Sequence, residues 1–365
     1  MLVSGIPVGT DERNRTVRIP ANPRNLICVV VGDSGCGKTT LVSNIAGSIA
    51  AEGDTVVIID GSGSYTDSEI HPCLRQKYYK YLRRVDIKKE GIPLPIWPYH
   101  APDSGDYREE DVDVVLDILT QTVTLGPIQK MQLRRCLEHA YDHRIYMEDH
   151  MRQIDFSIEN CLMEKEAAPI INKLHYLLKR VRINPTLGLW KGAVNILDIN
   201  EYSVNAQPQV MDLILAILWQ NCQTIDPKEN GRLYITLDEL HRVNFSTKGA
   251  TPLSSIIREG RKYGVGLILS TQTLQTFTKQ QNALLNQAAT KLFGVHATEE
   301  ALFVAKLVGN SDRQVKDLAV RLKTLRKGDF LMAGDKFIEM DCENAPIIIT
   351  NNITSSMPVW QERIK

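Results

Sequence analysis

Short apolar runs separated by amphipathic segments dominate the two ends of this 365-residue chain. Mainly apolar runs, which are typical of strands buried on both faces, occupy 26–31, 55–60, 193–199, 233–239 and 266–272. Segments that predict helices follow at about 40–52, 207–223 and 251–263. Strands that alternate with helices favour a mainly parallel central sheet with helices on both faces, so the pattern predicts an α/β fold.

Weaker strand signals lie outside this alternation. Residues 1 to about 16 are polar and turn-rich, and the alternating segment Thr16–Pro20 predicts a short edge strand that ends at Pro20. Further short strands are expected at 291–295, 329–333 and 345–350.

The pattern changes between residues 68 and 190. Strand-like runs disappear, and apolar positions recur at three- and four-residue steps over 111–121, 127–142 and part of 157–181. We therefore expect a mostly helical insertion at 68–190. It would separate an amino-terminal part of the core at 1–67 from a carboxyl-terminal part at 191–365.

The insertion contains a basic and an acidic stretch. Residues 75–89 interleave lysines and arginines with tyrosines, and acidic residues dominate 103–117, after prolines at 93, 95 and 98. An amphipathic helix that pairs with the acidic stretch is the favoured interpretation. A surface on which nucleic-acid bases stack is the alternative.

The first core strand leads into a complete phosphate-loop motif, G-x-x-x-x-G-K-[ST]. The residues expected to bind nucleotide are Gly32, Asp33, Ser34, Gly35, Cys36, Gly37, Lys38, Thr39 and Thr40. The glycines allow backbone N–H groups to surround phosphates at the start of a helix. We expect Lys38 to contact the β- and γ-phosphates and Thr39 to bind Mg²⁺, so ATP and Mg²⁺ are the predicted cofactors.

The run at 233–239 ends in two carboxylates, Asp238 and Glu239. Downstream of a phosphate loop, an acidic residue at a strand tip can hold the Mg²⁺ that bridges phosphates, which is the role expected for Asp238. Glu239 is expected to polarise the attacking water as a general base. The alternative is an acidic pair at the amino end of a helix.

Two more residues complete the predicted catalytic set with Lys38 and Glu239. Gln272 ends the strand at 266–272, where its amide could contact the γ-phosphate and report hydrolysis. Arg261 precedes that strand, and we expect it to reach the γ-phosphate of a neighbouring subunit, with Arg258 as second choice. Both arginines could instead stabilise a helix end.

Composition bears on the expected binding partners, metal sites and cellular compartment. Basic and acidic residues number 43 each, so the formal net charge is zero and bulk charge does not call for nucleic acid. The seven cysteines lack C-x-x-C spacing, and His139 and His143 lack the companions of a zinc site. Without a signal peptide or a membrane-spanning run, we expect a cytoplasmic protein with no membrane contact.

In order, the motifs resemble those of the HerA/FtsK superfamily of P-loop motors, most of all its HerA branch. Residues 59–65 are similar to the family's D-x-x-G-E-Y, and 237–241 are similar to its D/E-E-x-H. The segment 258–272 matches the family closely, and 322–330 resembles its closing L-x-x-L-x-x-G segment. Ser64 stands where the family has glutamate.

The resemblance implies a RecA-like P-loop NTPase fold and a homo-oligomeric ring, usually a hexamer, with ATP between subunits and double-stranded DNA in the channel. It implies ATP hydrolysis coupled to DNA translocation or helicase activity, a nuclease or defence effector as partner, and the in-trans role of Arg261. The phosphate loop begins at residue 32, which leaves no room for the amino-terminal β-barrel of HerA proteins. The alternatives are a nucleotide-controlled scaffold that recruits an effector without translocation, and a secretion ATPase that moves protein.

Overall fold

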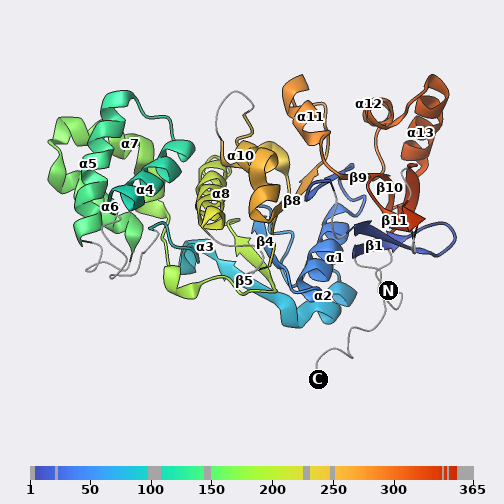
Figure 1. Ribbon diagram of the computed structural model, residues 1–365, viewed down its shortest axis with the longest axis horizontal. Helices are drawn as coiled ribbons and strands as arrows, with labels where there is room; N and C mark the ends of the chain where they lie inside the picture. Colours follow the sequence, from blue (N-terminus) through green and yellow to red (C-terminus); the bar gives the residue numbers. More distant parts are fainter. Residues whose placement is uncertain are drawn as a thin grey trace.

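The computed structural model describes residues 5–20, 24–97, 108–143, 149–224, 231–246, 251–338, 341–342 and 345–351. The strands of these residues form one 13-stranded sheet, in the order β12-β11-β2-β1-β13-β10-β9-β3-β8-β7-β4-β6-β5. Helices lie against the sheet, and further helices extend the molecule at both ends (Figure 1). The predicted α/β class is confirmed.

The half of the sheet that carries the phosphate loop is parallel. In spatial order its strands are β9 (Thr290–Phe293), β3 (Ile27–Val31), β8 (Val265–Thr271), β7 (Leu233–Leu237), β4 (Thr55–Asp60), β6 (Val194–Asp198) and β5 (Leu82–Asp86). Every neighbouring pair among them is parallel. All residues of β3, β4 and β8 are buried, as continuous apolar runs predict. The loops after β3, β8, β7 and β4 therefore meet at one edge of the sheet.

The other half of the sheet is antiparallel. Its strands are β10 (Asp329–Gly334), β13 (Ile347–Thr350), β1 (Gly5–Thr10), β2 (Thr16–Pro20), β11 (Phe337–Ile338) and β12 (Asp341–Cys342). The strand expected at Thr16–Pro20 is present, but the expectation of an edge strand is wrong, because β2 lies between β1 and β11. β1 was hidden by Gly5, Pro7 and Gly9, which have low strand propensity; its pairing with β2 and β13 holds it in place.

The helices next to the sheet bury separate cores on its two faces. They are α1 (Lys38–Ala51), α2 (Pro72–Tyr78), α3 (Ile87–Glu90), α8 (Gln207–Gln223) and α10 (Pro252–Glu259). Val30 belongs to the core under α1, whereas its neighbour Val29 belongs to the core that includes α8. This follows from the alternation of side chains along a strand. The predicted helix at 251–263 is α10 followed by a 3₁₀ turn, η6 (Gly260–Tyr263).

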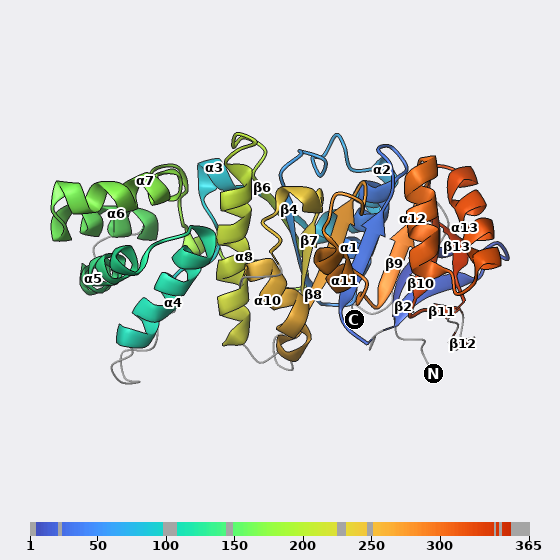
Figure 2. The ribbon, with the colours of Figure 1, turned by 90° about the horizontal axis from the view of Figure 1, so that it is seen from above.

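The helices predicted within 68–190 form a lobe at one end of the molecule (Figure 2). They are α4 (Arg108–Thr122), α5 (Pro127–His143), α6 (His150–Cys161) and α7 (Glu164–Arg180). The expectation that strands are absent from this block is wrong for β5, which pairs with β6 and ends the sheet. Only Leu82 and Val85 are apolar in β5, so a short half-polar edge strand left no periodic signal.

The basic stretch does not form the expected helix against the acidic stretch. Residues 75–89 divide among α2, a 3₁₀ turn η1 (Tyr79–Tyr81), β5 and α3. Arg84 instead pairs with Asp198 of β6 at 2.6 Å. In the acidic stretch, Asp113 pairs with Arg134 of α5, and residues 103–107 lie outside the described residues. These ion pairs join each stretch to other parts of the chain, and neither pair joins the two stretches to each other.

The remaining helices are α11 (Lys279–Leu285), α12 (Thr298–Val308) and α13 (Asp312–Thr324). In both views α12 and α13 lie together at the end of the molecule opposite the α4–α7 lobe (Figures 1 and 2). Within the described residues, no helix has both the length and the apolar character needed to span a bilayer.

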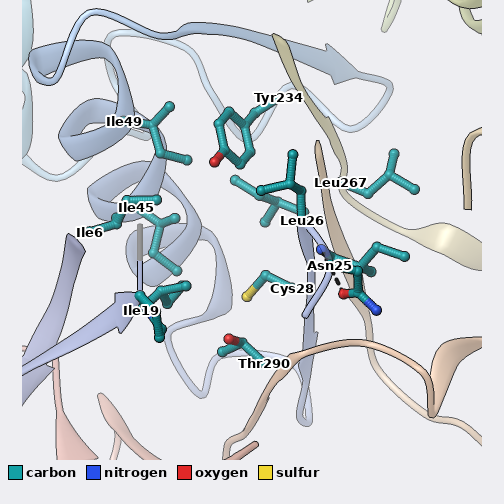
Figure 3. A pocket seen from close by; sticks show the side chains of 13 residues that line it. Ile6, Ile19, Asn25, Leu26, Cys28, Ile45, Ile49, Tyr234, Leu267 and Thr290 are labelled. Atoms are coloured by element: carbon teal, nitrogen blue, oxygen red, sulfur yellow. Dashed lines mark hydrogen bonds between the residues drawn. The ribbon is translucent and has the colours of Figure 1, made fainter. Parts of the chain in front are cut away.

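A small cavity lies between α1 and the sheet, near the start of β3 (Figure 3). It has a volume of about 20 Å³ and is lined mainly by apolar side chains, among them Ile19, Ile45 and Leu267. A space of that size holds at most one water molecule, so this cavity is a packing defect and not a nucleotide site.

Candidate active site

The phosphate loop follows β3, and its glycines let the backbone come close to a bound phosphate. Gly35 and Gly37 have φ values of 80° and 106°, which a side chain would strain. Gly37 is the residue before α1, whose first turn starts at Lys38 and presents free backbone N–H groups. Gly328, which precedes β10, donates its N–H to the Cys36 carbonyl at 2.9 Å. The closing segment of the sequence therefore lies directly against the phosphate loop.

Lys38 is folded back into its own loop. Its Nζ donates to the carbonyls of Gly32 at 2.7 Å and Asp33 at 3.1 Å, and the residue is only 8% exposed. An ammonium group held in the concavity of this loop matches the position from which a lysine meets phosphate oxygens.

Thr39 and Asp238 lie side by side. The Thr39 hydroxyl donates to Asp238 Oδ2 over 3.4 Å, although the two residues come from different strand–loop junctions. Asp238 directly follows β7 and is 7% exposed. A buried carboxylate beside a hydroxyl gives the oxygen ligands that Mg²⁺ prefers, so these residues fit the ion that the sequence predicts.

Glu239 adopts an unusual backbone conformation. Its φ of 65° and ψ of 54° lie in the left-handed region, which costs free energy for a residue with a side chain. This backbone conformation points the two neighbouring carboxylates to different partners. Asp238 contacts Thr39, whereas Glu239 Oε1 accepts a hydrogen bond from Gln272 Nε2 at 3.1 Å. Strain of this kind is typical of functional sites, where the surrounding structure holds a side chain in place.

Gln272 reaches Glu239 because of the strand order. β8, which ends one residue before Gln272, lies between β3 and β7. The amide therefore sits between the phosphate loop and the carboxylate pair. His241, the last residue of the segment that is similar to D/E-E-x-H, contacts the other oxygen of Glu239, with Nδ1 3.2 Å from Oε2. The structure thus brings together Lys38, Thr39, Asp238, Glu239 and Gln272.

Comparisons with known proteins give relatives of this chain in sequence and in fold. The chain is 23% identical over 343 residues to the DNA double-strand break repair helicase HerA of Saccharolobus solfataricus. VirB4 of Thermoanaerobacter pseudethanolicus matches with a TM-score of 0.65 at 15% identity, over 98% of both chains. Plasmid coupling protein TrwB in complex with GDPNP matches with a TM-score of 0.60 at 13% identity, over 96% of this chain and 90% of that one. No family model matches the chain.

The HerA match covers 88% of this chain. The chain is similar in sequence to a HerA helicase and similar in fold to VirB4 and TrwB, in line with its resemblance to the HerA/FtsK superfamily. Its fold is RecA-like, with the helical lobe inserted between the second and later core strands. The chain spans 64% of the length of that HerA protein.

Sequence patterns did not reveal Glu300, a residue outside strand β8 that holds the turn after Gln272. Glu300 of α12 accepts a hydrogen bond from the Thr273 hydroxyl and another from the Leu274 N–H, both at 2.7 Å. Its side chain is buried, and beside it lies the buried His296, whose Nδ1 is 3.8 Å from Asp33 Oδ1. Burial lowers the pKa of His296, which favours its neutral form. The Gln272 turn is therefore fixed from α12 as well as from β8.

Replacing Glu300 with glutamine is expected to reduce kcat for ATP hydrolysis about tenfold while the KM for ATP changes little. The substitution weakens two charge-assisted hydrogen bonds, worth roughly 1.5–3 kcal/mol in buried surroundings, without touching the phosphate loop. Steady-state kinetics measures both constants. The matched control is Glu299→Gln on the exposed face of the same helix turn. Equal kcat for the two variants would remove Glu300 from this role.

Arg261 lies far from the site in its own subunit. It belongs to η6 at the start of β8, whereas Gln272 follows the end of that strand. Its guanidinium donates to the carbonyl of Arg24, which precedes β3, and the side chain is exposed. Arg261 is therefore at the edge of the sheet opposite the phosphate loop of its own chain.

The cysteines and histidines give no sign of a second reactive centre. Burial raises the pKa of the Cys36 thiol, so the cysteine of the phosphate loop is not a thiolate. His139 and His143 stack with ring centroids 4.2 Å apart, and His139 Nδ1 contacts Ser157 Oγ. Across the described residues, no group of three or more His, Cys, Asp or Glu side chains could hold a metal ion.

Asp212 is a buried carboxyl on α8 beneath the loop that follows the carboxylate pair. Burial raises its pKa to about 7, although hydrogen bonds from Asn244 oppose the shift. In an unfolded chain the pKa is about 4. Between these values the folded protein keeps a proton that the unfolded chain has lost, so stability falls as pH rises from about 4 to 7.

Asp212→Asn is expected to remove this dependence. Relative to the parent, the variant should gain about 2–3 kcal/mol more at pH 8 than at pH 5, because an amide has no proton to lose. Denaturant unfolding of both proteins at the two pH values measures the difference. An equal stability change at pH 5 and pH 8 would show that the Asp212 carboxyl does not titrate in this range.

Proposed function

We propose that this chain is an ATP-hydrolysing motor that translocates along or unwinds double-stranded DNA as a homo-oligomeric ring. The observation that carries the proposal is the contact of Glu239 with Gln272 beside a phosphate loop, on a chain similar to a DNA repair helicase. In this proposal the arrangement would provide a base, a sensor and a phosphate cradle at one edge of the sheet.

Each residue has a distinct part in hydrolysis. The backbone of 32–40 and the Lys38 ammonium would hold the phosphates, and Thr39 and Asp238 would hold the Mg²⁺ that neutralises developing charge. Glu239 would accept a proton from the attacking water. Gln272 would release or engage Glu239 according to whether a γ-phosphate is present, and Glu300 would pass that change to α12. TrwB, which shares the fold, has been solved with ADP and Mg²⁺.

A ring would let Arg261 of one subunit supply a cation to the γ-phosphate bound by its neighbour. Arg261 lies at the opposite edge of the sheet, and a head-to-tail interface would bring that edge to the nucleotide of the next subunit. Such an interface closes into a ring when its rotation allows, and six subunits is the number that the family resemblance suggests. Double-stranded DNA would occupy the channel.

A nuclease or another effector is the proposed partner. A motor alone moves along DNA without changing it, so a second activity is needed for end processing or defence. The competing scaffold function would use nucleotide only to control assembly and effector recruitment.

ATP-dependent displacement of a third strand from a DNA triplex tests the proposal. A translocating ring is expected to remove the third strand with ATP, whereas Glu239→Gln is expected to remove none. Nucleotide-dependent assembly without displacement by the parent protein would support the scaffold instead. Strand displacement with a non-hydrolysable analogue would contradict the link to hydrolysis.

A further inference from the structure

The turn after β4 is held as a rigid cap by one carboxylate. Asp60 is fully buried, and its Oδ1 accepts hydrogen bonds from the N–H groups of Ser62, Gly63 and Ser64 at 2.8–3.2 Å. Its Oδ2 accepts the N–H of Tyr65 at 3.1 Å. Successive backbone donors on one buried carboxylate leave this turn little freedom.

Three other side chains hold the same turn from outside. Gln207 of α8 donates to the Gly61 carbonyl at 2.9 Å, and Arg242 donates to it at 3.4 Å. At the far end of the turn, Arg84 of β5 donates to the Tyr65 carbonyl at 3.1 Å while it pairs with Asp198. The backbone at Tyr65 is therefore anchored by the sheet, α8 and the edge strand together.

The anchored turn directs the Tyr65 side chain into the active site. Tyr65 is 1% exposed, and its hydroxyl donates to Asp238 Oδ2 at 3.3 Å. The same oxygen accepts the Thr39 hydroxyl at 3.4 Å. A carboxylate oxygen can only accept, so the Tyr65 hydroxyl is the donor in this contact.

We propose that Tyr65 is a positioning residue for Asp238, which it would hold at a fixed orientation so that Asp238 and Thr39 together would bind Mg²⁺. The inference rests on the proposed role of Asp238 as a magnesium ligand. A phenol held by a rigid turn fixes the carboxylate rotation with little loss of side-chain entropy. Partners of this kind set ligand orientation, and their loss costs metal affinity.

The test is Tyr65→Phe, with Tyr78→Phe as matched control. Tyr78 is also buried, at 4% exposure, and its hydroxyl contacts Ser48 Oγ at 2.9 Å and Asn44 Oδ1 at 3.2 Å, away from the carboxylates. Both variants lose one buried hydroxyl. The probe is a fluorescent ADP, whose binding is measured by anisotropy without Mg²⁺ and over a Mg²⁺ titration.

For Tyr65→Phe we expect unchanged ADP affinity without Mg²⁺. We define the Mg²⁺ midpoint as the Mg²⁺ concentration that gives half of the Mg²⁺-dependent change in ADP binding, and we expect it to rise about tenfold. Tyr78→Phe should match the parent in both. A Mg²⁺ midpoint for Tyr65→Phe equal to that of the parent would overturn the inference, as would equal weakening with and without Mg²⁺.

Two further variants distinguish a failure of the proposed magnesium role of Asp238 from a failure of the Tyr65 inference. Asp238→Asn should abolish the Mg²⁺ effect, and if it does not, the proposed magnesium role fails before the Tyr65 inference is reached. Arg84→Lys keeps the charge opposite Asp198 but cannot bond both partners as the guanidinium does, so it should raise the Mg²⁺ midpoint less than Tyr65→Phe. It keeps the inference testable if Tyr65→Phe fails to fold, and a midpoint for Arg84→Lys equal to that of the parent would then overturn it.

Discussion

Replacing Glu239 with glutamine is expected to reduce kcat for ATP hydrolysis by about 10²–10⁴ while ATP affinity stays within a few-fold of the parent. The amide has the shape of the carboxylate but cannot accept a proton from water. It can still contact Gln272 and His241, which lie 3.1 and 3.2 Å from the two Glu239 oxygens, so the local structure should survive. Single-turnover hydrolysis and equilibrium binding of ATP measure the two effects separately.

The matched control for this substitution is Glu259→Gln, because Glu259 ends α10 on the exposed surface. It should hydrolyse ATP at the parent rate. If Glu239→Gln kept more than about a tenth of the parent rate, Glu239 would not be the general base.

The second large effect is expected from Arg261→Ala, which should lower kcat by about 10³ in assembled rings. The reason is geometric, since Arg261 lies at the edge of the sheet opposite its own phosphate loop, and under the proposed ring it would complete a neighbour's site. Lys262→Ala is the control, because it removes an exposed cation from the same 3₁₀ turn.

Mixing the Arg261→Ala protein with the Glu239→Gln protein shows whether Arg261 acts on the active site of its own subunit or on that of a neighbour. An interface is active when one subunit supplies an intact Glu239 and its neighbour supplies an intact Arg261. In the mixture this requires an Arg261→Ala subunit next to a Glu239→Gln subunit. Equal mixing should therefore restore roughly a quarter of the interfaces in a head-to-tail ring. No recovery, with subunit exchange shown independently, would contradict the in-trans role.

The core of the fold and the main residues of the site could be predicted because both depend on local patterns. Buried parallel strands are continuous apolar runs, and the ends of β3, β7 and β8 meet at one edge whatever their distance in sequence. The motifs therefore pointed to Lys38, Asp238 and Gln272 as site residues, and the strand order brings them to the same edge of the sheet. The family resemblance then gave the order of the motifs.

The strands β1 and β5 could not be predicted, because tertiary pairing overrides their weak local signals. β1 carries glycines and a proline, and β5 carries two arginines. The basic stretch was misjudged for the same reason, since its arginines serve the sheet edge and not an amphipathic helix.

The supporting residues of the site were also missed, because their partners are distant in sequence. Tyr65 meets Asp238 across 173 positions, and Glu300 meets Thr273 across 27. Spacing rules describe contacts along one helix or strand, and neither contact is of that kind. The left-handed backbone of Glu239 likewise has no local sequence signal such as glycine.

The most direct measurement of the central claim is the rate of ATP hydrolysis by the purified protein with and without double-stranded DNA, with Glu239→Gln in parallel. A DNA-coupled motor predicts strong stimulation by DNA in the parent protein and none in the variant. A rate that is indifferent to DNA, while Glu239→Gln still abolishes it, would contradict the motor and leave an ATPase whose nucleotide cycle serves another task.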